Sequence, residues 1–205
     1  QHELKDLNAF RLHVTDRAHF EGLSDIVLET AQKSASEAQL EGWRCTLHDS
    51  CYVPFMTYAS NRELRRQMYF AKNTICNQGN ENDNNAVVTR IVNIRREIAQ
   101  ILGHECFADF VLEKRMAKNK EAVYKLLDEL ILTYKPIAQS EMNAVRALAK
   151  EMEGEDFQLE CWDFAYYSNK LKTKLFDIDA EMLKPYFKLE NVKKGVFGLA
   201  TRLYD

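Results

Sequence analysis

Two short segments near the start of the chain alternate apolar and polar side chains. Residues 10–14 read Phe-Arg-Leu-His-Val, and residues 43–47 read Trp-Arg-Cys-Thr-Leu. Alternation with a period of two is typical of a strand with one buried face. We therefore expect two short strands that can pair as a small antiparallel ribbon. Between them, Ser24 can cap a helix that runs to about Gln39, and Gly42 ends that segment.

From residue 60 onward the apolar positions follow the spacing of helices. Ser60 and Glu63 form a capping-box pattern. The polar tract 78–85 predicts a loop that ends in a helix N-cap. Helical spacing then continues to Ile101, and Gly103 is the predicted stop. The apolar positions of this helix are Val87, Val88, Ile91, Ile94, Ile98 and Ile101.

A long helix is predicted from Asn119, whose side chain can cap it, to Gly154. Pro136 lies inside this pattern and should kink the helix or divide it in two. Asp179 can cap a further short helix around residues 182–183.

The last helical pattern is still running when the chain ends. Apolar residues at 196, 197, 199, 200, 203 and 204 are followed directly by Asp205, with no Gly or Asn to cap the helix. We expect a boundary that cuts through a helix. Because no linker or repeat interrupts the chain, residues 1–205 are read as one incomplete helical segment. The predicted fold class is mainly α, an irregular multi-helix array with at most a small β-ribbon near residues 10–14 and 43–47.

Composition excludes several classes of protein. The 205 residues carry 28 Lys and Arg against 31 Asp and Glu, so no basic stripe for nucleic acid is expected. No apolar run approaches the roughly 20 residues of a membrane span, so membrane insertion is not expected either. Five cysteines are an odd number for a disulfide framework, and we expect reduced, mostly buried thiols. Reduced thiols favour a cytoplasmic location, and a periplasmic one stays open.

Two patterns resemble metal sites without completing one. His104-Glu105 resembles the start of a zinc helix motif, but the second histidine position is occupied by Ala108. The second pattern offers three possible zinc ligands, Cys45, His48 and Cys51, and lacks the fourth that zinc needs. We therefore expect two core thiols with a surface histidine, and a surface or capping role for His104. No residue of this chain is predicted to bind a metal.

The segment 150–167 combines an acidic turn with a dense aromatic run. The carboxylates around Gly154 are Glu151, Glu153, Glu155, Asp156 and Glu160. Paired acids can perform acid–base chemistry, but acids beside a glycine favour a solvated loop. The run Trp162-Asp163-Phe164-Ala165-Tyr166-Tyr167 is interpreted as helix packing, with the wall of a substrate channel as the alternative. Gly-x-Ser-x-Gly, P-loop and Rossmann motifs are absent from the sequence.

An ordered set of short motifs extends over about 190 residues of the chain. The motifs include Leu12–Asp16, Pro54–Ala59, Asn61–Arg65, Asn80–Asn84, Ile94–Ala99, Trp162–Tyr167, Phe176–Asp179, Lys184–Leu189 and Gly195–Phe197. The set resembles the thimet-oligopeptidase-like zinc metallopeptidases, most closely their bacterial peptidyl-dipeptidase (dipeptidyl carboxypeptidase) branch. Cys161 departs from the family pattern, in which a proline is expected before the tryptophan.

The resemblance implies two mostly helical halves around a narrow channel with zinc at its floor. Two histidines and a glutamate would hold the metal, and a further glutamate would activate water. The family motif His-Glu-x-x-His is not present in these 205 residues. No catalytic residue is therefore assigned here, and the substrate-binding residues stay unknown.

Two functions follow as hypotheses. In the first, this chain supplies scaffold and channel wall of a zinc metallopeptidase that cleaves short peptides and releases C-terminal dipeptides. The chain alone would then be inactive, and its partners would be peptide substrates and the missing C-terminal catalytic part. In the second, it is a stand-alone helical interaction module without catalysis.

Overall fold

The computed structural model describes residue 5, residues 9–177 and residues 183–204, and it confirms the predicted fold class. Helices dominate, and the described strands form one two-stranded sheet. The elements are β1 (Leu12–Val14), the 3-10 helix η1 (Arg17–Phe20), α2 (Asp25–Glu37), β2 (Trp43–Cys45), α3 (Asp49–Tyr58), α4 (Arg62–Asn73), α5 (Asn85–Ile101), α6 (Phe107–Leu112), α7 (Lys120–Glu153), α8 (Phe164–Phe176), the 3-10 helix η2 (Lys184–Tyr186) and α10 (Leu189–Tyr204).

The predicted ribbon forms where the alternating segments lie. Strand β1 pairs antiparallel with β2, with Leu12 opposite Cys45 and Val14 opposite Trp43. Gly42 precedes β2 with a φ of +92°, and a Cβ there would lie 2.4 Å from the carbonyl oxygen of Val14. Glycine is required at this position because both the backbone angle and the space exclude a side chain.

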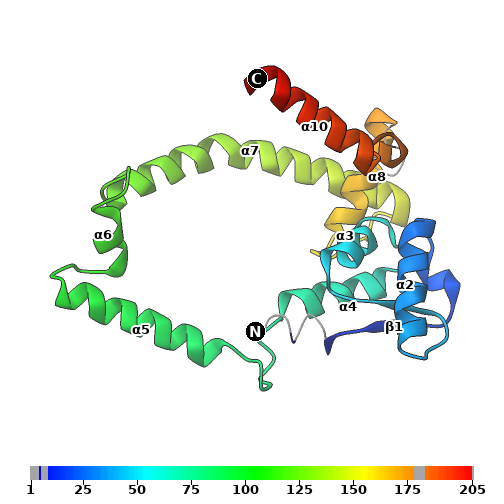
Figure 1. The fold of residues 1–205 in the computed structure, drawn as a ribbon, viewed down its shortest axis with the longest axis horizontal. Coiled ribbons are helices and arrows are strands. Elements are labelled where there is room, and N and C mark those ends of the chain that lie inside the picture. Colours follow the sequence, from blue (N-terminus) through cyan, green and yellow to red (C-terminus); the bar gives the residue numbers. More distant parts are fainter. Residues whose placement is uncertain (1–4, 6–8, 178–182, 205) are drawn as a thin grey trace.

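The main core joins the ribbon to α2, α3 and α4. Phe20, Leu47, Phe55 and Met68 are almost fully buried there, and the ring of Phe20 stands edge-on to Phe55 at 5.8 Å. A second, smaller core lies where the end of α7 meets α8, around Val145, Ala149 and Tyr167. These two cores make up the compact part of the molecule (Figure 1).

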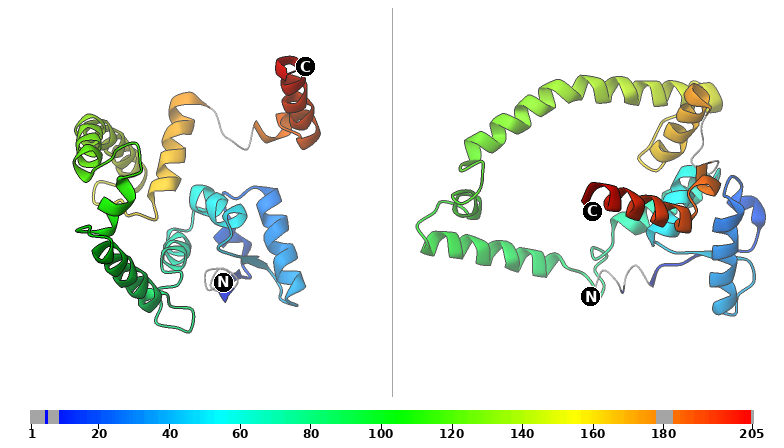
Figure 2. Two further views of the ribbon diagram at one scale, coloured as in Figure 1. Left: turned by 60° about the vertical axis from the view of Figure 1, so that its left-hand side comes forward. Right: turned by 45° about the horizontal axis from the view of Figure 1, so that its top comes forward.

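Helices α5 and α6 and most of α7 form an arm that leaves the compact part after α4 and returns to it at α8. Figures 1 and 2 show this arm as a wide arc, with α5 and α7 on opposite sides and α6 at the far end. Between residues 85 and 141, Ala99 alone is buried among the described side chains. The arm therefore has almost no core of its own.

Several helix ends were predicted correctly. Asn119 caps α7 by accepting a hydrogen bond from the backbone N–H of Ala122, at 2.9 Å. Gly103 and Gly154 follow α5 and α7 with positive φ angles. Ser24 occupies the N-cap position of α2, although its side chain makes no capping bond.

Other local predictions were wrong. Asn61 caps α4 by accepting from the backbone N–H of Leu64, while the Ser60 hydroxyl donates to Glu21 and Glu63 pairs with Arg66. The capping box is displaced because an Asn at the next position offers a closer acceptor.

Pro136 does not divide α7, which runs unbroken from Lys120 to Glu153. The helix curves along its length in Figure 1. One missing N–H costs a single hydrogen bond, and curvature relieves the clash of the proline ring. The predicted cap at Asp179 lies outside the described residues.

Candidate functional site

The cysteine–histidine pattern lies in and beside the main core. Cys45 ends β2, Cys51 lies in the first turn of α3, and both are buried, while His48 is exposed at the N-cap of α3. A hydrogen bond with Cys51, together with burial, raises the pKa of the Cys45 thiol. A thiol that stays protonated is a poor metal ligand and nucleophile. The prediction of two core thiols and a surface histidine is confirmed.

The remaining cysteines only partly match the prediction. All five are free, as expected. Only Cys45 and Cys51 are buried, however, so the prediction of mostly buried thiols was wrong. Cys76 and Cys106 are half-buried and Cys161 is exposed, because they lie on loops outside the main core.

His104 lies in the turn between α5 and α6. Its ring packs against Phe110, and its Nε2 lies 3.6 Å from a carboxylate oxygen of Glu113. This pairing ties the two helices together at their junction and brings no second histidine near the first.

The acidic cluster around Gly154 is divided among different partners. Glu151 accepts from the Lys174 ammonium at 2.7 Å, Lys150 lies 3.5 Å from Glu155, and Glu153 accepts from the hydroxyl of Tyr167 at 2.9 Å. Burial, and then the bond to Glu153, raises the pKa of Tyr167. Glu151 and Glu153 hold α8 against the end of α7, while Glu155 pairs back to α7.

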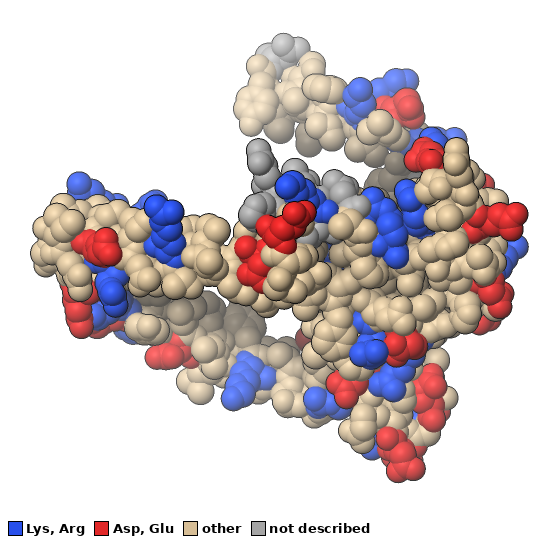
Figure 3. All heavy atoms as spheres, turned by 90° about the horizontal axis from the view of Figure 1, so that it is seen from below, with Lys and Arg blue, Asp and Glu red and all other residues tan. Residues whose placement is uncertain are grey.

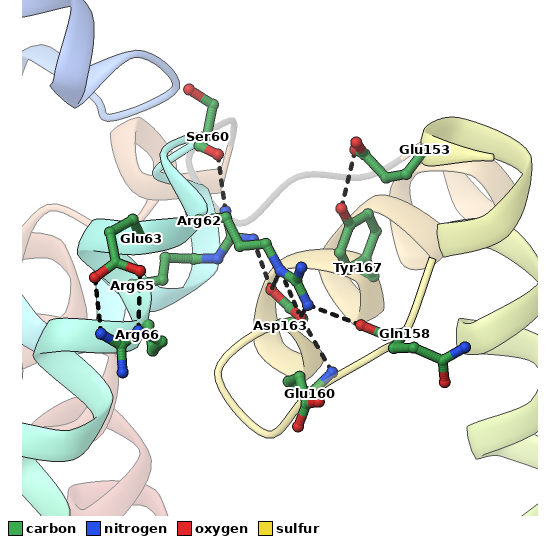
Figure 4. Close-up of polar contacts among 10 residues, drawn as sticks. All are labelled: Ser60, Arg62, Glu63, Arg65, Arg66, Glu153, Gln158, Glu160, Asp163 and Tyr167. Atoms are coloured by element: carbon green, nitrogen blue, oxygen red, sulfur yellow. Dashed lines mark hydrogen bonds and ion pairs between the residues drawn. The ribbon is translucent and has the colours of Figure 1, made fainter. Parts of the chain in front are cut away.

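The structure gathers its strongest polar contacts around Asp163, inside the predicted aromatic segment. Asp163 is fully buried, and its carboxylate accepts from Arg62 Nη2 at 2.7 Å and from Arg65 Nη2 at 2.9 Å. It also accepts from Arg62 Nε and from the backbone N–H of Glu160 (Figure 4). We call Arg62, Arg65 and Asp163 the arginine–aspartate junction.

The two arginines are held by further contacts. The guanidinium of Arg65 donates to the carbonyl oxygens of Ala59 and Ser60 and lies over the ring of Tyr166 at 4.3 Å. Arg62 donates to the carbonyl of Gln158, and its bonds with Asp163 raise its pKa. A carboxylate enclosed in this way has no open side for a substrate. The junction is therefore a positioning element that fixes the segment before α8 onto α4.

Sequence reasoning missed the two arginines and the role of Asp163. One signal was present: Arg62 and Arg65 lie in the first turn of a helix, where the helix dipole disfavours positive charge. Two cations at that position indicate an acidic partner from elsewhere. The partner lies about a hundred residues away, so local spacing could not identify it.

Trp162 packs against the aromatic side chains of α4. Its ring centroid lies 5.6 Å from that of Phe70 and 6.3 Å from that of Tyr69. An apolar hollow of about 210 Å³ adjoins this cluster. It is lined by Tyr52, Val53, Met56, Thr57, Tyr69, Cys161, Phe164 and Ala165.

The zinc implied by the resemblance does not fit the part of the chain that the structure describes. Over residues 9–177 and 183–204, no group of three or more His, Cys, Asp or Glu side chains is placed to hold a metal ion. No helix in the same ranges is both long and apolar enough to cross a membrane.

The described elements form a mainly helical array that the arginine–aspartate junction helps to hold together. Comparison with known proteins identifies the family of the chain. The sequence model described as Peptidase family M3 matches residues 55–205, well over half of the chain. The chain belongs to peptidase family M3, which confirms the resemblance seen in the motifs.

Relatives match the chain almost from end to end. It is 37% identical to oligopeptidase A of Escherichia coli over 195 residues and 30% identical to dipeptidyl carboxypeptidase of the same organism. It is 32% identical to the probable cytosolic oligopeptidase A of Arabidopsis thaliana over 203 residues. Each alignment covers 93 to 95% of this chain. The chain spans only 28 to 29% of the length of these relatives.

Proposed function

We propose that these 205 residues are the scaffold of a longer zinc metallopeptidase that cleaves short peptides. The observation that carries the proposal is the family match over residues 55–205, combined with a chain that spans less than a third of its relatives. Zinc and the residues that bind it would belong to the rest of the parent protein. The chain alone would then hydrolyse no peptide.

Two proteins test this proposal, the 205-residue chain and its full-length parent. Each is supplied with zinc and a short unstructured peptide, and the products are followed by mass spectrometry. We expect cleavage by the parent, loss of that cleavage with a chelator, and no cleavage by the 205-residue chain. Chelator-sensitive turnover by the shorter chain would refute its inactivity, and a parent that binds no zinc would refute the peptidase itself.

The finer proposal is that the parent releases dipeptides from free C-termini. The 30% identity to a dipeptidyl carboxypeptidase supports it, while the 37% identity to an oligopeptidase A supports only the coarser proposal of an enzyme that acts on oligopeptides. The test of the finer proposal compares a peptide that has a free C-terminus with the same peptide made as its C-terminal amide. Successive loss of dipeptides from the free acid alone supports the finer proposal, and internal cleavage of both peptides contradicts it.

The apolar hollow beside Trp162 is the part of this chain that we propose as channel wall. It is lined by aromatic and aliphatic side chains, which suit the apolar side chains of an extended peptide. Cross-linking from a photoreactive peptide to Tyr52 or Phe164 in the parent tests this placement.

The five free cysteines support a cytoplasmic location, and the periplasm is the alternative.

A stand-alone interaction module is the second candidate function. The uncovered apolar side chains of the arm favour it, because exposed apolar surface marks interaction sites. A stop codon after Asp205 and a reproducible protein partner would support the module. A reading frame that continues to a His-Glu-x-x-His motif would support the peptidase.

A further inference from the structure

The longest helix of the chain is largely unsupported. Every residue of α7 from Tyr124 to Glu141 is exposed, and only its last turns pack against α8. Leu126 and Ile131 each expose 57% of their surface, and Leu130 exposes 42%. A stretch so widely exposed has little packing that would fix it in the arc of Figure 1.

Most of the apolar residues of α7 between Val123 and Ile137 lie on one side of the helix, whereas the exposed Tyr124 and Leu132 lie off that side. A spacing of three and four residues places the majority along one stripe, while Lys125, Asp128 and Glu129 lie on other sides. A wide stripe of this kind is the pattern of a helix that packs against a core. We call it the α7 stripe; it comprises Val123, Leu126, Leu127, Leu130, Ile131, Tyr134 and Ile137.

Two open hollows lie along this part of α7. One, of about 470 Å³, is lined by Leu130, Ile131, Tyr134, Lys135 and Ala138. The other, of about 480 Å³, lies off the stripe around Leu132, Pro136 and Gln139, and shares Ile131 and Lys135 with the first. Ridges of one helix pack into the grooves of another, so the first hollow suits the side chains of a helix packed on the stripe.

Helix α5 carries a matching stripe on the other side of the arm. Val87, Ile91, Ile94 and Ile98 recur at helical spacing, and each is between 39 and 48% exposed. We call these residues the α5 stripe. Arg96 lies on the opposite side of the same helix. Both long helices of the arm therefore have an uncovered apolar side.

The extent of uncovered surface distinguishes between occupants. The chain exposes 15,103 Å², whereas a compact monomer of 23.9 kDa exposes about 9,900 Å². The excess is about 5,000 Å², several times the roughly 800 Å² that one partner buries in a standard interface. A second copy or a transient partner would leave most of it uncovered.

Charge also argues against a partner bound by electrostatics. On the face shown in Figure 3, Lys and Arg side chains are interspersed with Asp and Glu among larger areas of uncharged surface. The net charge of the chain is only −3. An occupant of these stripes would be recognised by its apolar surface.

We propose that the α5 and α7 stripes are packing surfaces for helices from the rest of the parent polypeptide. The occupant is of the required size, because the matched relatives are more than three times as long as this chain. The inference rests on the proposed function in one respect, namely that a longer parent exists. It adds which faces are covered in that parent.

Single cysteines provide the test. Leu130→Cys and Ile91→Cys report on the two stripes, while Lys125→Cys and Arg96→Cys are the matched controls on the opposite sides of the same helices. Each variant is made in the 205-residue chain and in the full-length parent. Labelling by a maleimide is then followed at each site by peptide mass spectrometry.

In the 205-residue chain, we expect the stripe and control positions to react at similar rates. In the parent, the two stripe positions should react at least about tenfold more slowly, because labelling must await a local opening of the packed helices. The two control positions should react as they do in the shorter chain.

Three results would overturn the proposal. Fast labelling of the stripe positions in the parent would show that these faces are uncovered there. Protection in the 205-residue chain that is lost on dilution would assign them to a second copy. Protection in the parent that appears only when a peptide is added would make them a substrate wall. Labelling does not depend on turnover, so a protected parent without peptidase activity would refute the proposed function and leave this inference standing.

Discussion

The buried carboxylate of Asp163 should be the most sensitive single group of the compact part. Asp163→Asn keeps the shape of the side chain and removes its charge. Arg65, which is 1% exposed, would then keep a buried guanidinium without its carboxylate partner. Removing one member of a buried ion pair costs about 3–5 kcal/mol. Arg62 contributes less to this figure because its side chain is 42% exposed.

The measurement is urea unfolding of the 205-residue chain followed by circular dichroism. Asp163→Asn should lower the free energy of unfolding by about 3 kcal/mol or more, at an unchanged dependence on urea. Glu151→Gln is the control, since it breaks the exposed pair with Lys174 and should cost under about 1 kcal/mol. Equal, small losses for both variants would refute the reasoning, because the junction would then be no stronger than a surface pair.

Three further predictions concern the same compact part. Tyr167→Phe should cost about 1 kcal/mol for the lost bond to Glu153. The pKa of Tyr167 is raised in the folded protein, so the stability that its hydroxyl contributes is complete below the unfolded pKa of about 10 and is lost as pH rises above it. Urea midpoints in alkaline buffer should therefore fall less steeply for this variant than for the wild type. Gly42→Ala should destabilise by more than Gly79→Ala, since both have positive φ but only the first would place a Cβ against backbone; equal urea midpoints would contradict this. Trp162→Ala should cost about 3 kcal/mol, and a loss below about 1 kcal/mol would contradict the packing on α4.

The parts of the fold that could be predicted depend on local patterns. Alternation at 10–14 and 43–47 located both strands, and helical spacing with a capping Asn and a closing Gly located α5 and α7. Helix α3 was not predicted, because its apolar side chains surround it without a clear period and Pro54 lies inside it. Its position is set by packing against the main core, which spacing does not report.

The junction could not be predicted for a different reason. Asp163 was noted as part of an aromatic run, and the segment Asn61–Arg65 was noted as part of a motif. Neither segment carries a local signal that it contacts the other, since about a hundred residues separate them. A contact at this separation depends on the tertiary fold, which local spacing does not report.

The path of the arm explains why the strongest polar contacts lie where they do. The arm leaves the compact part after α4 and has little core of its own, so it cannot bring its two ends together. The arginine–aspartate junction joins the start of α4 to the segment that follows α7, and the end of α7 packs on α8 beside it. Because a buried ion pair requires well-defined geometry, it fixes where the C-terminal end of α7 meets the compact part. A helix fixed at one end and apolar along one side is suited to receive further helices, and weakening the junction should therefore disturb the arm as well as the compact part.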